Sequence, residues 1–394
     1  MAVQTVKDLD LKGRRVLVRA DFNVPLKDGI ITDDTRIRAA LPTLEYILGQ
    51  EGASLILMSH LGRPKGERKP ELSLAPVAQR LAELLDRPVE MAPDCIGPEV
   101  KAMSEKIGSG GVILLENVRF HKAETENDTD FAAKLAGNGD VFVNDAFGTA
   151  HRAHASTEGV ARVLPSAAGF LIEKEVRFFE HLLSNPEKPF VAIIGGAKVS
   201  TKIGVLETLM QKCTSLVIGG AMSYTFLKAQ GHQVGKSKVE DDYVETAKDL
   251  IRRAEAAGVQ LVLPVDHVAG AQFDEKTEAK YIDGLDLPDE LIGMDIGPKS
   301  LRNLKDVIGG AKSLVWNGPM GVFEFDKFAK GTLEVAEMVA ACEGTTVVGG
   351  GDSVAAVNKF GFAGKIDHVS TGGGASLEYL EGKKLPGIAI LEKE

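Results

Sequence analysis

The sequence predicts an α/β protein with two doubly wound, parallel-sheet (Rossmann-like) domains joined by an interdomain helix. Three observations support this prediction. Short apolar runs alternate with longer helical patterns, two prolines interrupt the alternation near the middle of the chain, and 394 residues are too many for one ordinary core. Strands that alternate with helices form a parallel sheet covered on both faces.

The first domain is expected over residues 1–168. Its strand candidates lie at residues 15–20, 54–59, 112–115 and 141–144. A helix is expected after the first strand, with Thr32 or Asp33 as its N-cap. The apolar stripe of this helix follows the helical period and consists of Ile37, Leu41, Leu44 and Leu48. Residues 74–85 show the same helical pattern.

The connecting helix and hinge are expected over residues 169–188. A helical pattern covers residues 169–183, and Pro186 and Pro189 end it. The second domain is expected over residues 189–379, with strands at 190–194, 215–218, 260–264, 313–316, 345–348 and 368–370. The polar region 271–289 is predicted to be an irregular surface excursion. The tail over residues 380–394 contains an apolar stretch, 388–391, which we expect to pack rather than to extend into solvent.

Composition excludes several classes of protein. The net charge of −10 argues against a general nucleic-acid or membrane-surface binder, because such proteins carry a basic field. Cys95, Cys213 and Cys342 lie far apart without a CxxC pair, which gives neither a disulfide framework nor a zinc site. No apolar segment resembles a signal peptide or a membrane span, so we expect a cytoplasmic protein.

The common nucleotide motifs are absent. The segment 231–237 resembles a phosphate-binding P-loop, but it is one residue too short and follows a helical stretch instead of a strand. No G-x-G-x-x-G fingerprint is present either, which argues against a dinucleotide-binding enzyme.

Glycine-rich loops nevertheless follow strands in the second half. Gly195 and Gly196 follow the strand 190–194, and Lys198 and Lys202 are expected on one face of the helix that opens there. An anion between the two lysines would offset their repulsion. The alternative is a tight turn with two solvated lysines.

A second glycine-rich loop, 349–353, exposes backbone N–H groups to phosphate oxygens. Asp352 in this loop offers a hard oxygen ligand for Mg²⁺, or it merely caps the following helix. Another such loop, 371–376, gives a weaker indication. Glu324 follows the only tryptophan and is either a ribose acceptor or, on local grounds preferably, a solvated acid.

The first half places polar and cationic residues at strand ends or in first helical turns. They are Asp21, Asn23, Arg36, His60, Arg63, Arg119 and Arg152. Arginine matches phosphate and carboxylate oxygens with two parallel donors, although a single arginine more often forms a surface salt bridge. Because the carboxyl ends of parallel strands share one edge, these residues are expected to face one anion. Two differently built anion sites suggest phosphoryl transfer between two substrates. His151 and His154 are expected to be structural rather than metal ligands.

Seven segments, in order along nearly the whole chain, resemble the motifs of the phosphoglycerate kinase family, and the compact length resembles its bacterial members. The segments are DFNVP (21–25), SHLGRP (59–64), LENVRF (115–120), GTAHRAH (148–154), GGAKV (195–199), WNGP (316–319) and GGGD (349–352). The resemblance implies transfer of the acyl phosphate of 1,3-bisphosphoglycerate to ADP, with Mg²⁺, in a monomer. It also implies that the C-terminal segment returns to the first domain.

The resemblance implies a role for each matching residue. The substrate-binding set is Asp21, Asn23, Arg36, His60, Arg63, Arg119 and Arg152. The nucleotide-binding set is Gly196, Lys198, Lys202, Gly220, Gly293, Asn317, Glu324, Gly350, Gly351, Asp352 and Ser353, with Asp352 orienting the metal. Arg36 and Lys202 are expected to converge on the migrating phosphoryl group by hinge closure, in a direct in-line transfer. Two alternatives are a nicotinamide dehydrogenase and a non-catalytic anion-binding module.

Overall fold

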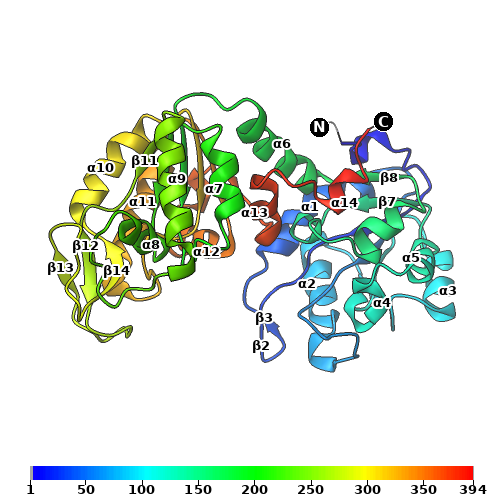
Figure 1. Cartoon of the computed structure of the whole chain (residues 1–394). Helices are drawn as coiled ribbons and strands as arrows, with labels where there is room; N and C mark the ends of the chain where they lie inside the picture. Colours follow the sequence, from blue (N-terminus) through cyan, green and yellow to red (C-terminus); the bar gives the residue numbers. More distant parts are fainter. Residues whose placement is uncertain (1–2, 394) are drawn as a thin grey trace. The chain divides into compact units, whose positions relative to one another are not determined.

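The computed structural model describes residues 3–393 and divides the chain into two compact units (Figure 1). The first unit contains the residues up to Arg177 and those from Lys384 onwards, and the second contains Phe178–Lys383. The division falls inside helix α6 (Phe170–Ser184), in the region predicted as the connecting helix. In the described part of the chain, no helix combines the length and the apolar character needed to cross a membrane.

The first unit is built on a six-stranded parallel sheet of order β5-β6-β4-β1-β7-β8. The strands are β1 (Arg15–Arg19), β4 (Ser54–Met58), β5 (Glu90–Met91), β6 (Val112–Leu114), β7 (Val141–Asn144) and β8 (Ser166–Ala168). The predicted strands are confirmed to within two residues at each end, whereas the short edge strands β5 and β8 were not predicted. A small hairpin, β2 (Leu26–Lys27) with β3 (Ile30–Ile31), follows β1.

Two cores cover the two faces of this sheet. Val16 and Val18 of β1 belong to the core with helices α1 (Thr35–Leu48) and α2 (Ala75–Leu85), whereas Leu17 belongs to the opposite core. Because successive side chains alternate between buried faces, the strand reads as a continuous apolar run. The opposite face holds α3 (Pro98–Lys106) and α5 (Thr129–Ala136), and Ala123 of the single-turn helix α4 (Lys122–Thr125) packs against this core.

Helix α1 begins later than predicted. Asp34, not Thr32 or Asp33, is its N-cap residue, while the Asp33 carboxylate accepts a hydrogen bond from the backbone N–H of Thr35 at 2.8 Å. Leu41 and Leu48 are half-buried against the core that fully buries Ile37 and Leu44. The predicted apolar stripe is therefore confirmed, although Ile37 and Leu44 are buried more deeply than Leu41 and Leu48.

The second unit contains a six-stranded parallel sheet of order β11-β10-β9-β15-β16-β17. The strands are β9 (Phe190–Ile194), β10 (Ser215–Ile218), β11 (Gln260–Val262), β15 (Ser313–Asn317), β16 (Thr345–Gly349) and β17 (His368–Val369). In chain order this is the doubly wound 3-2-1-4-5-6 arrangement, which reverses between β9 and β15. The carboxyl ends of these two central strands align, since Asn317 pairs with Ile194. The predicted fold class is confirmed.

Helices cover both faces of this second sheet. They are α7 (Ile203–Met210), α8 (Met222–Ala229), α9 (Val244–Ala256), α10 (Pro298–Gly309), α11 (Lys330–Ala340), α12 (Gly351–Lys359) and α13 (Gly374–Leu380). The region 271–289 was predicted to be irregular, and this was wrong in part. It contains β13 (Lys280–Ile282), which pairs antiparallel with β12 (His267–Gly270), and β12 also pairs with β14 (Ile292–Ile296). Lys280 and Tyr281 are exposed, so β13 lacks the apolar run that identified the other strands.

The C-terminal segment packs against the first unit. Its short helix α14 (Pro386–Ala389) lies beside β7 and β8 in Figure 1. The backbone N–H of Gly387 donates to the carbonyl of Ala150 at 2.9 Å, and the N–H of Gln4 donates to the carbonyl of Leu391 at 2.8 Å. Ile388 is 5% exposed, whereas Ile390 is 36% exposed. The apolar tail is thus tied down by backbone hydrogen bonds and by burial.

This difference in exposure predicts the effect of truncating either isoleucine. Ile388→Ala should lower the free energy of unfolding by about 2–5 kcal/mol, because it leaves a cavity in a packed interface. The matched variant Ile390→Ala should cost about 1 kcal/mol or less. Urea unfolding followed by far-ultraviolet circular dichroism measures both, and equal losses in the two variants would contradict the packing described here. The only tryptophan, Trp316, lies in the second unit, so its fluorescence reports that unit separately.

Candidate active site

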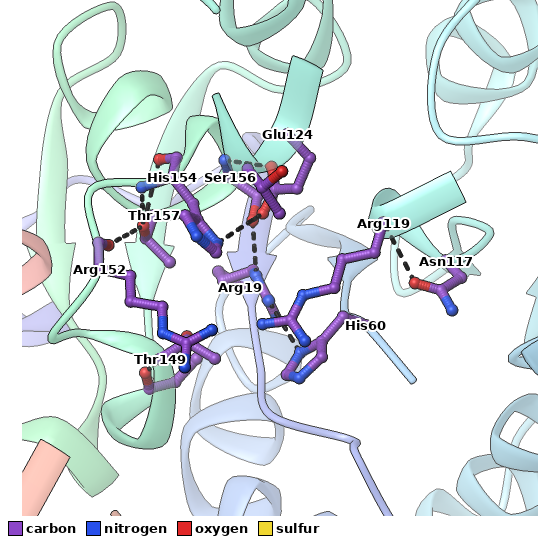
Figure 2. A network of polar contacts seen from close by, with 12 residues as sticks. Arg19, His60, Asn117, Arg119, Glu124, Thr149, Arg152, His154, Ser156 and Thr157 are labelled. Atoms are coloured by element: carbon purple, nitrogen blue, oxygen red, sulfur yellow. Dashed lines mark hydrogen bonds and ion pairs between the residues drawn. The ribbon is translucent and has the colours of Figure 1, made fainter. Parts of the chain in front are cut away.

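A buried arginine anchors the functional edge of the first unit. Arg19 is the last residue of β1, and its side chain is fully buried. Figure 2 shows this side chain among its polar neighbours. Its Nε donates to Ser156 Oγ at 2.8 Å, and one terminal nitrogen donates to the carbonyl of Ala20 at 2.5 Å. The other terminal nitrogen lies 3.1 Å from Nδ1 of His60. Each of the three guanidinium nitrogens of Arg19 therefore has a hydrogen-bond partner.

The contact with Arg19 fixes the proton of His60. A guanidinium only donates, so Nδ1 of His60 is the acceptor and Nε2 carries the hydrogen. Burial, followed by the positive charges of Arg19 and Arg119, holds the pKa of His60 well below its usual value. His60, which follows β4 and is 4% exposed, is consequently a neutral side chain whose Nε2 carries the proton.

A buried carboxylate balances the charge of Arg19 without touching it. Ser156 Oγ, which accepts from Arg19, donates to Glu124 Oε1 at 2.6 Å, and the N–H of Ser156 donates to Oε2 at 2.8 Å. Glu124 is fully buried and lies 3.7 Å from Nδ1 of His154. Burial and the neighbouring Arg119 and Arg19 lower the pKa of His154 to about 4, so this histidine is also neutral.

Asp21 and Asn23 organise the loop that follows β1. Asp21 accepts from Arg36 at 3.3 Å and from the N–H of Asn23 at 3.1 Å. Arg36, in the first turn of α1, also donates to the carbonyl of Asn23 at 3.0 Å. The side-chain oxygen of Asn23 accepts from the N–H of Gly62 at 2.8 Å. These bonds join the loops after β1 and β4 and orient Arg36.

The remaining cations have no acidic partner. Among the described residues 3–393, no carboxylate forms an ion pair with Arg63, Arg119 or Arg152. Arg119 donates to the carbonyl of Gly62 at 3.1 Å, and its pKa falls to about 10 because of burial and repulsion from Arg19. Arg63 and Arg152 are exposed. The salt-bridge alternative therefore holds only for Arg36, and the edge of the sheet is left electropositive.

In the second unit, two glycine loops meet where the strand order reverses. The N–H of Gly195, after β9, donates to the carbonyl of Asn317 at the end of β15, at 2.9 Å. A Cβ on Gly195 would lie 2.2 Å from the carbonyl oxygen of Pro319, and one on Gly318 would lie 2.2 Å from that of Gly195. Only glycine allows these two backbones to approach so closely.

Two adjoining cavities open beside these loops. One, of about 270 Å³, is lined by the glycine loops, by Lys198 and Lys202, and by the start of α12. The other, of about 510 Å³, has a mostly apolar lining that includes Tyr224, Met294 and Val322. Gly196, Ala197 and Asp352 line both cavities. An apolar cavity next to a cavity lined by N–H groups and ammonium groups suits a nucleotide.

The predicted placement of the two lysines was wrong in its local geometry. Lys198 is exposed in the loop, and Lys202 is the N-cap residue of α7, so they do not lie on one helical face. Lys202 Nζ donates to Oδ1 of Asn317, which points it toward β15. Burial lowers the pKa of Lys202 to about 8, with Asp352 partly offsetting that effect.

The loop 350–353 begins helix α12. Gly350, with φ of 90°, is the N-cap residue, so the alternative in which Asp352 caps the helix is wrong. Ser353 is buried, and its Oγ accepts from the N–H of Gly318 at 2.5 Å. Gly351 and Asp352 are exposed in the first turn, where backbone N–H groups have no partner within the helix. This helix start faces the smaller cavity.

Gly220, Gly293 and Glu324 line the larger cavity. A Cβ on Gly220 would lie 2.5 Å from the backbone nitrogen of Gly196, and one on Gly293 would lie 1.9 Å from the Tyr224 hydroxyl. Glu324 is exposed at this cavity. The other glycine loop, 371–376, lines neither cavity.

Some members of the site were not predicted. Arg19, Glu124 and Ser156 form the buried support, and Tyr224 shapes the apolar cavity. The available signal was a charged residue, Arg19, that directly continues an apolar strand. Nothing in the local sequence of Glu124 or Ser156 indicates their contact with each other.

A cationic sheet edge in one unit and a glycine-lined cavity in the other are features of a small-molecule kinase. The phosphoglycerate kinase family model matches residues 6–383, and the chain belongs to this family. It is 60% identical to phosphoglycerate kinase of Borrelia hermsii and 56% identical to that of Clostridium novyi, covering 100% and 98% of each chain respectively.

Solved structures agree with this assignment. The phosphoglycerate kinase of Coxiella burnetii is similar with a TM-score of 0.90 at 42% identity, covering 99% of both chains. That of Pyrococcus horikoshii has a TM-score of 0.86 at 33% identity, covering 98% of both chains. The chain is a phosphotransferase that moves phosphate reversibly between 1,3-bisphosphoglycerate and ADP, a reaction of glycolysis. The dehydrogenase and non-catalytic alternatives are thereby excluded.

The Arg19–His60 contact predicts the protonation behaviour of His60. Nitrogen NMR correlations should show Nε2 protonated and Nδ1 unprotonated at neutral pH, and the ring should titrate well below the usual pKa of histidine, because burial and the nearby arginines lower its pKa. In Arg19→Met the pKa should rise, since a positive neighbour is removed. The surface variant Arg38→Met serves as control and should leave the spectrum unchanged. A wild-type His60 that titrates near its ordinary pKa would refute the assignment.

Proposed function

We propose that the cationic edge of the first unit binds the glycerate substrate. Its proposed contacts are Asp21, Asn23, Arg36, His60, Arg63, Arg119 and Arg152. The observation that carries this proposal is the absence of acidic partners for Arg63, Arg119 and Arg152 among the described residues. Guanidinium groups left without carboxylates can bind phosphate and carboxylate oxygens in paired geometry. The neutral His60 adds a donor without adding charge.

The proposed nucleotide site lies in the second unit. The apolar cavity suits the base, and Glu324 at this cavity is the proposed acceptor for ribose hydroxyls. Lys198, Lys202 and the start of α12 suit the phosphates, because unpaired N–H groups and the helix dipole favour anions there. The remaining proposed nucleotide contacts are Gly196, Gly220, Gly293, Asn317, Gly350, Gly351 and Ser353.

Asp352 is the proposed residue that orients Mg²⁺ on the nucleotide. Its exposed carboxylate lines both cavities, and no hydrogen bond or ion pair holds it among residues 3–393. A hard carboxylate oxygen beside phosphate-binding N–H groups fits this cation, which prefers one or two protein ligands together with phosphate oxygens. When bound, Mg²⁺ neutralises charge on the nucleotide phosphates.

We propose direct in-line transfer in which Arg36 and Lys202 contact the migrating phosphoryl group from the two units. Phosphoryl transfer depends mainly on positioning and on charge stabilisation, which cationic side chains supply. The proposed domains are 1–168 for the glycerate substrate and 189–379 for the nucleotide, with 169–188 as the connecting hinge and 380–394 as the returning segment. Closure of this hinge excludes water, which would otherwise hydrolyse the acyl phosphate. We also propose that the protein is a cytoplasmic monomer.

Replacing either catalytic cation should lower kcat strongly. Arg36→Ala and Lys202→Ala should each reduce kcat about 100–1000-fold, equivalent to about 2.7–4 kcal/mol, because each removes a donor to the transition state. A coupled assay of ATP formation from ADP and 1,3-bisphosphoglycerate measures this loss.

The matched control for Arg36 lies two residues further along the same helix. Arg38 pairs with Asp34 at 2.9 Å on the surface, so Arg38→Ala should retain nearly full kcat. Chelation of divalent cations should abolish ATP formation in the wild-type protein. Normal turnover of Arg36→Ala or Lys202→Ala would disprove the assigned role of that residue.

Small-angle X-ray scattering tests hinge closure and the monomer together. The radius of gyration should decrease when both 3-phosphoglycerate and an ATP analogue are present, compared with either ligand alone, because only the ternary complex offers charges to both catalytic cations. The forward scattering should correspond to one chain of 42.0 kDa. Identical curves in all ligand states would count against closure, and a doubled mass would count against the monomer.

A further inference from the structure

A second cluster of reactive side chains lies in the first unit, outside the proposed active site. Asp94 and Cys95 lie between β5 and α3, and His121 precedes α4. One ligand atom from each residue, a carboxylate oxygen, the thiol sulfur and an imidazole nitrogen, lies within 4.8 Å of the other two. His121 Nε2 is already 2.7 Å from Asp94 Oδ1. No step of the phosphoryl transfer uses these groups.

The donor set matches a borderline transition metal. Oxygen, nitrogen and sulfur donors together suit Zn²⁺ better than Mg²⁺ or Ca²⁺, which prefer oxygen alone. Ligand atoms around tetrahedral Zn²⁺ are roughly 3.3–3.8 Å apart. Side-chain rotations that shift the three ligand atoms by about an ångström therefore bring them to this spacing. Cys95 is fully buried, while the side chains of Asp94 and His121 are 35% and 29% exposed. The exposed parts of Asp94 and His121 leave one side of the cluster open to solvent.

Surrounding bonds hold the three residues in place. The carbonyl of Asp94 accepts from the N–H of Glu116 at 3.3 Å, and the carbonyl of Cys95 accepts from Nδ2 of Asn138 at 3.2 Å. The N–H of His121 donates to Val118, and its ring packs at 5.2 Å from that of Phe131. These contacts hold the backbones of Asp94 and Cys95 and the plane of the His121 ring in place.

We propose that Asp94, Cys95 and His121 form a three-ligand site for Zn²⁺ or a cation of similar chemistry, with one open coordination position. This proposal departs from the expectation, drawn from the cysteine spacing, that the chain has no zinc site. Cys95 lacks a CxxC partner and His121 lies far from it along the chain, so only the fold brings these residues together. Metal binding would tie the loop after β5 to the segment that carries Arg119 and Glu124. On binding, the thiol of Cys95 releases its proton to solvent and its sulfur bonds to the metal.

Cobalt(II) titration of the nucleotide-free protein tests the sulfur ligand directly. Co²⁺ is a spectroscopic substitute for Zn²⁺, and a thiolate ligand gives a charge-transfer band in the near ultraviolet that oxygen and nitrogen ligands do not give. We expect this band in the wild-type protein, its displacement by Zn²⁺, and its loss in Cys95→Ser. The matched control Cys213→Ser removes another buried thiol, from the second unit, and should retain the band.

The histidine ligand has a matched control as well. His232 pairs with Asp286 at 3.2 Å, but among the described residues no thiol joins this pair in a three-ligand cluster. His121→Asn should weaken Zn²⁺ binding at least tenfold in a competition titration, whereas His232→Asn should not change it. Zn²⁺ should also raise the thermal midpoint of the wild-type protein and not that of His121→Asn, because binding to the native state stabilises it. This variant carries the test if Cys95→Ser does not fold.

The proposal is overturned if the wild-type protein shows no charge-transfer band. It is also overturned if the band survives in Cys95→Ser, or if the two histidine variants lose Zn²⁺ affinity equally. The last result would indicate dispersed surface binding by histidine–carboxylate pairs.

Discussion

Burial of the Arg19 guanidinium is the constraint on which the first unit depends. A charge removed from water is costly unless it is paired and hydrogen-bonded. Direct contact with a carboxylate would satisfy Arg19 but would place negative charge beside the anion site. The structure instead inserts the Ser156 hydroxyl between Arg19 and Glu124. The carboxylate of Glu124 therefore balances the positive charge of Arg19 through the Ser156 hydroxyl, while the guanidinium still donates to Nδ1 of His60.

The proposed anion site of the second unit consists mainly of backbone groups. Its central strands β9 and β15 end at the same level, and the loops after them are close enough to share hydrogen bonds only because both contain glycine. Peptide N–H groups supply partial positive charge that does not titrate and does not need a counter-ion. Of the two cavities beside them, the larger can therefore remain apolar while the smaller is electropositive. The two proposed anion sites thus rest on different physical means, cationic side chains in the first unit and mainly backbone groups in the second.

The sequence contains enough information for the main sheets, because each buried strand is a continuous apolar run bounded by polar or glycine residues. It fails for β13, whose exposed Lys280 and Tyr281 give no such run. It also fails for the helix after Gly196, since a helical spacing of lysines cannot reveal that the helix begins only at Ile203. Strand-end residues such as His60 and Arg119 were identified from position alone. The residues that support them, Glu124 and Ser156, were not identified, because only the tertiary fold brings these two residues together.

The two proposed catalytic cations differ for a physical reason. The planar guanidinium of Arg36 carries several donors, so one terminal nitrogen can donate to Asp21 and to the carbonyl of Asn23 while other N–H groups stay available to a ligand. An ammonium group is a compact charge whose pKa responds to burial, and that of Lys202 falls to about 8. Its hydrogen bond to the neutral Asn317 orients Nζ without neutralising it. In the proposed nucleotide complex, a phosphate beside Lys202 would favour the charged form, because an anion next to an ammonium group raises the pKa of that group.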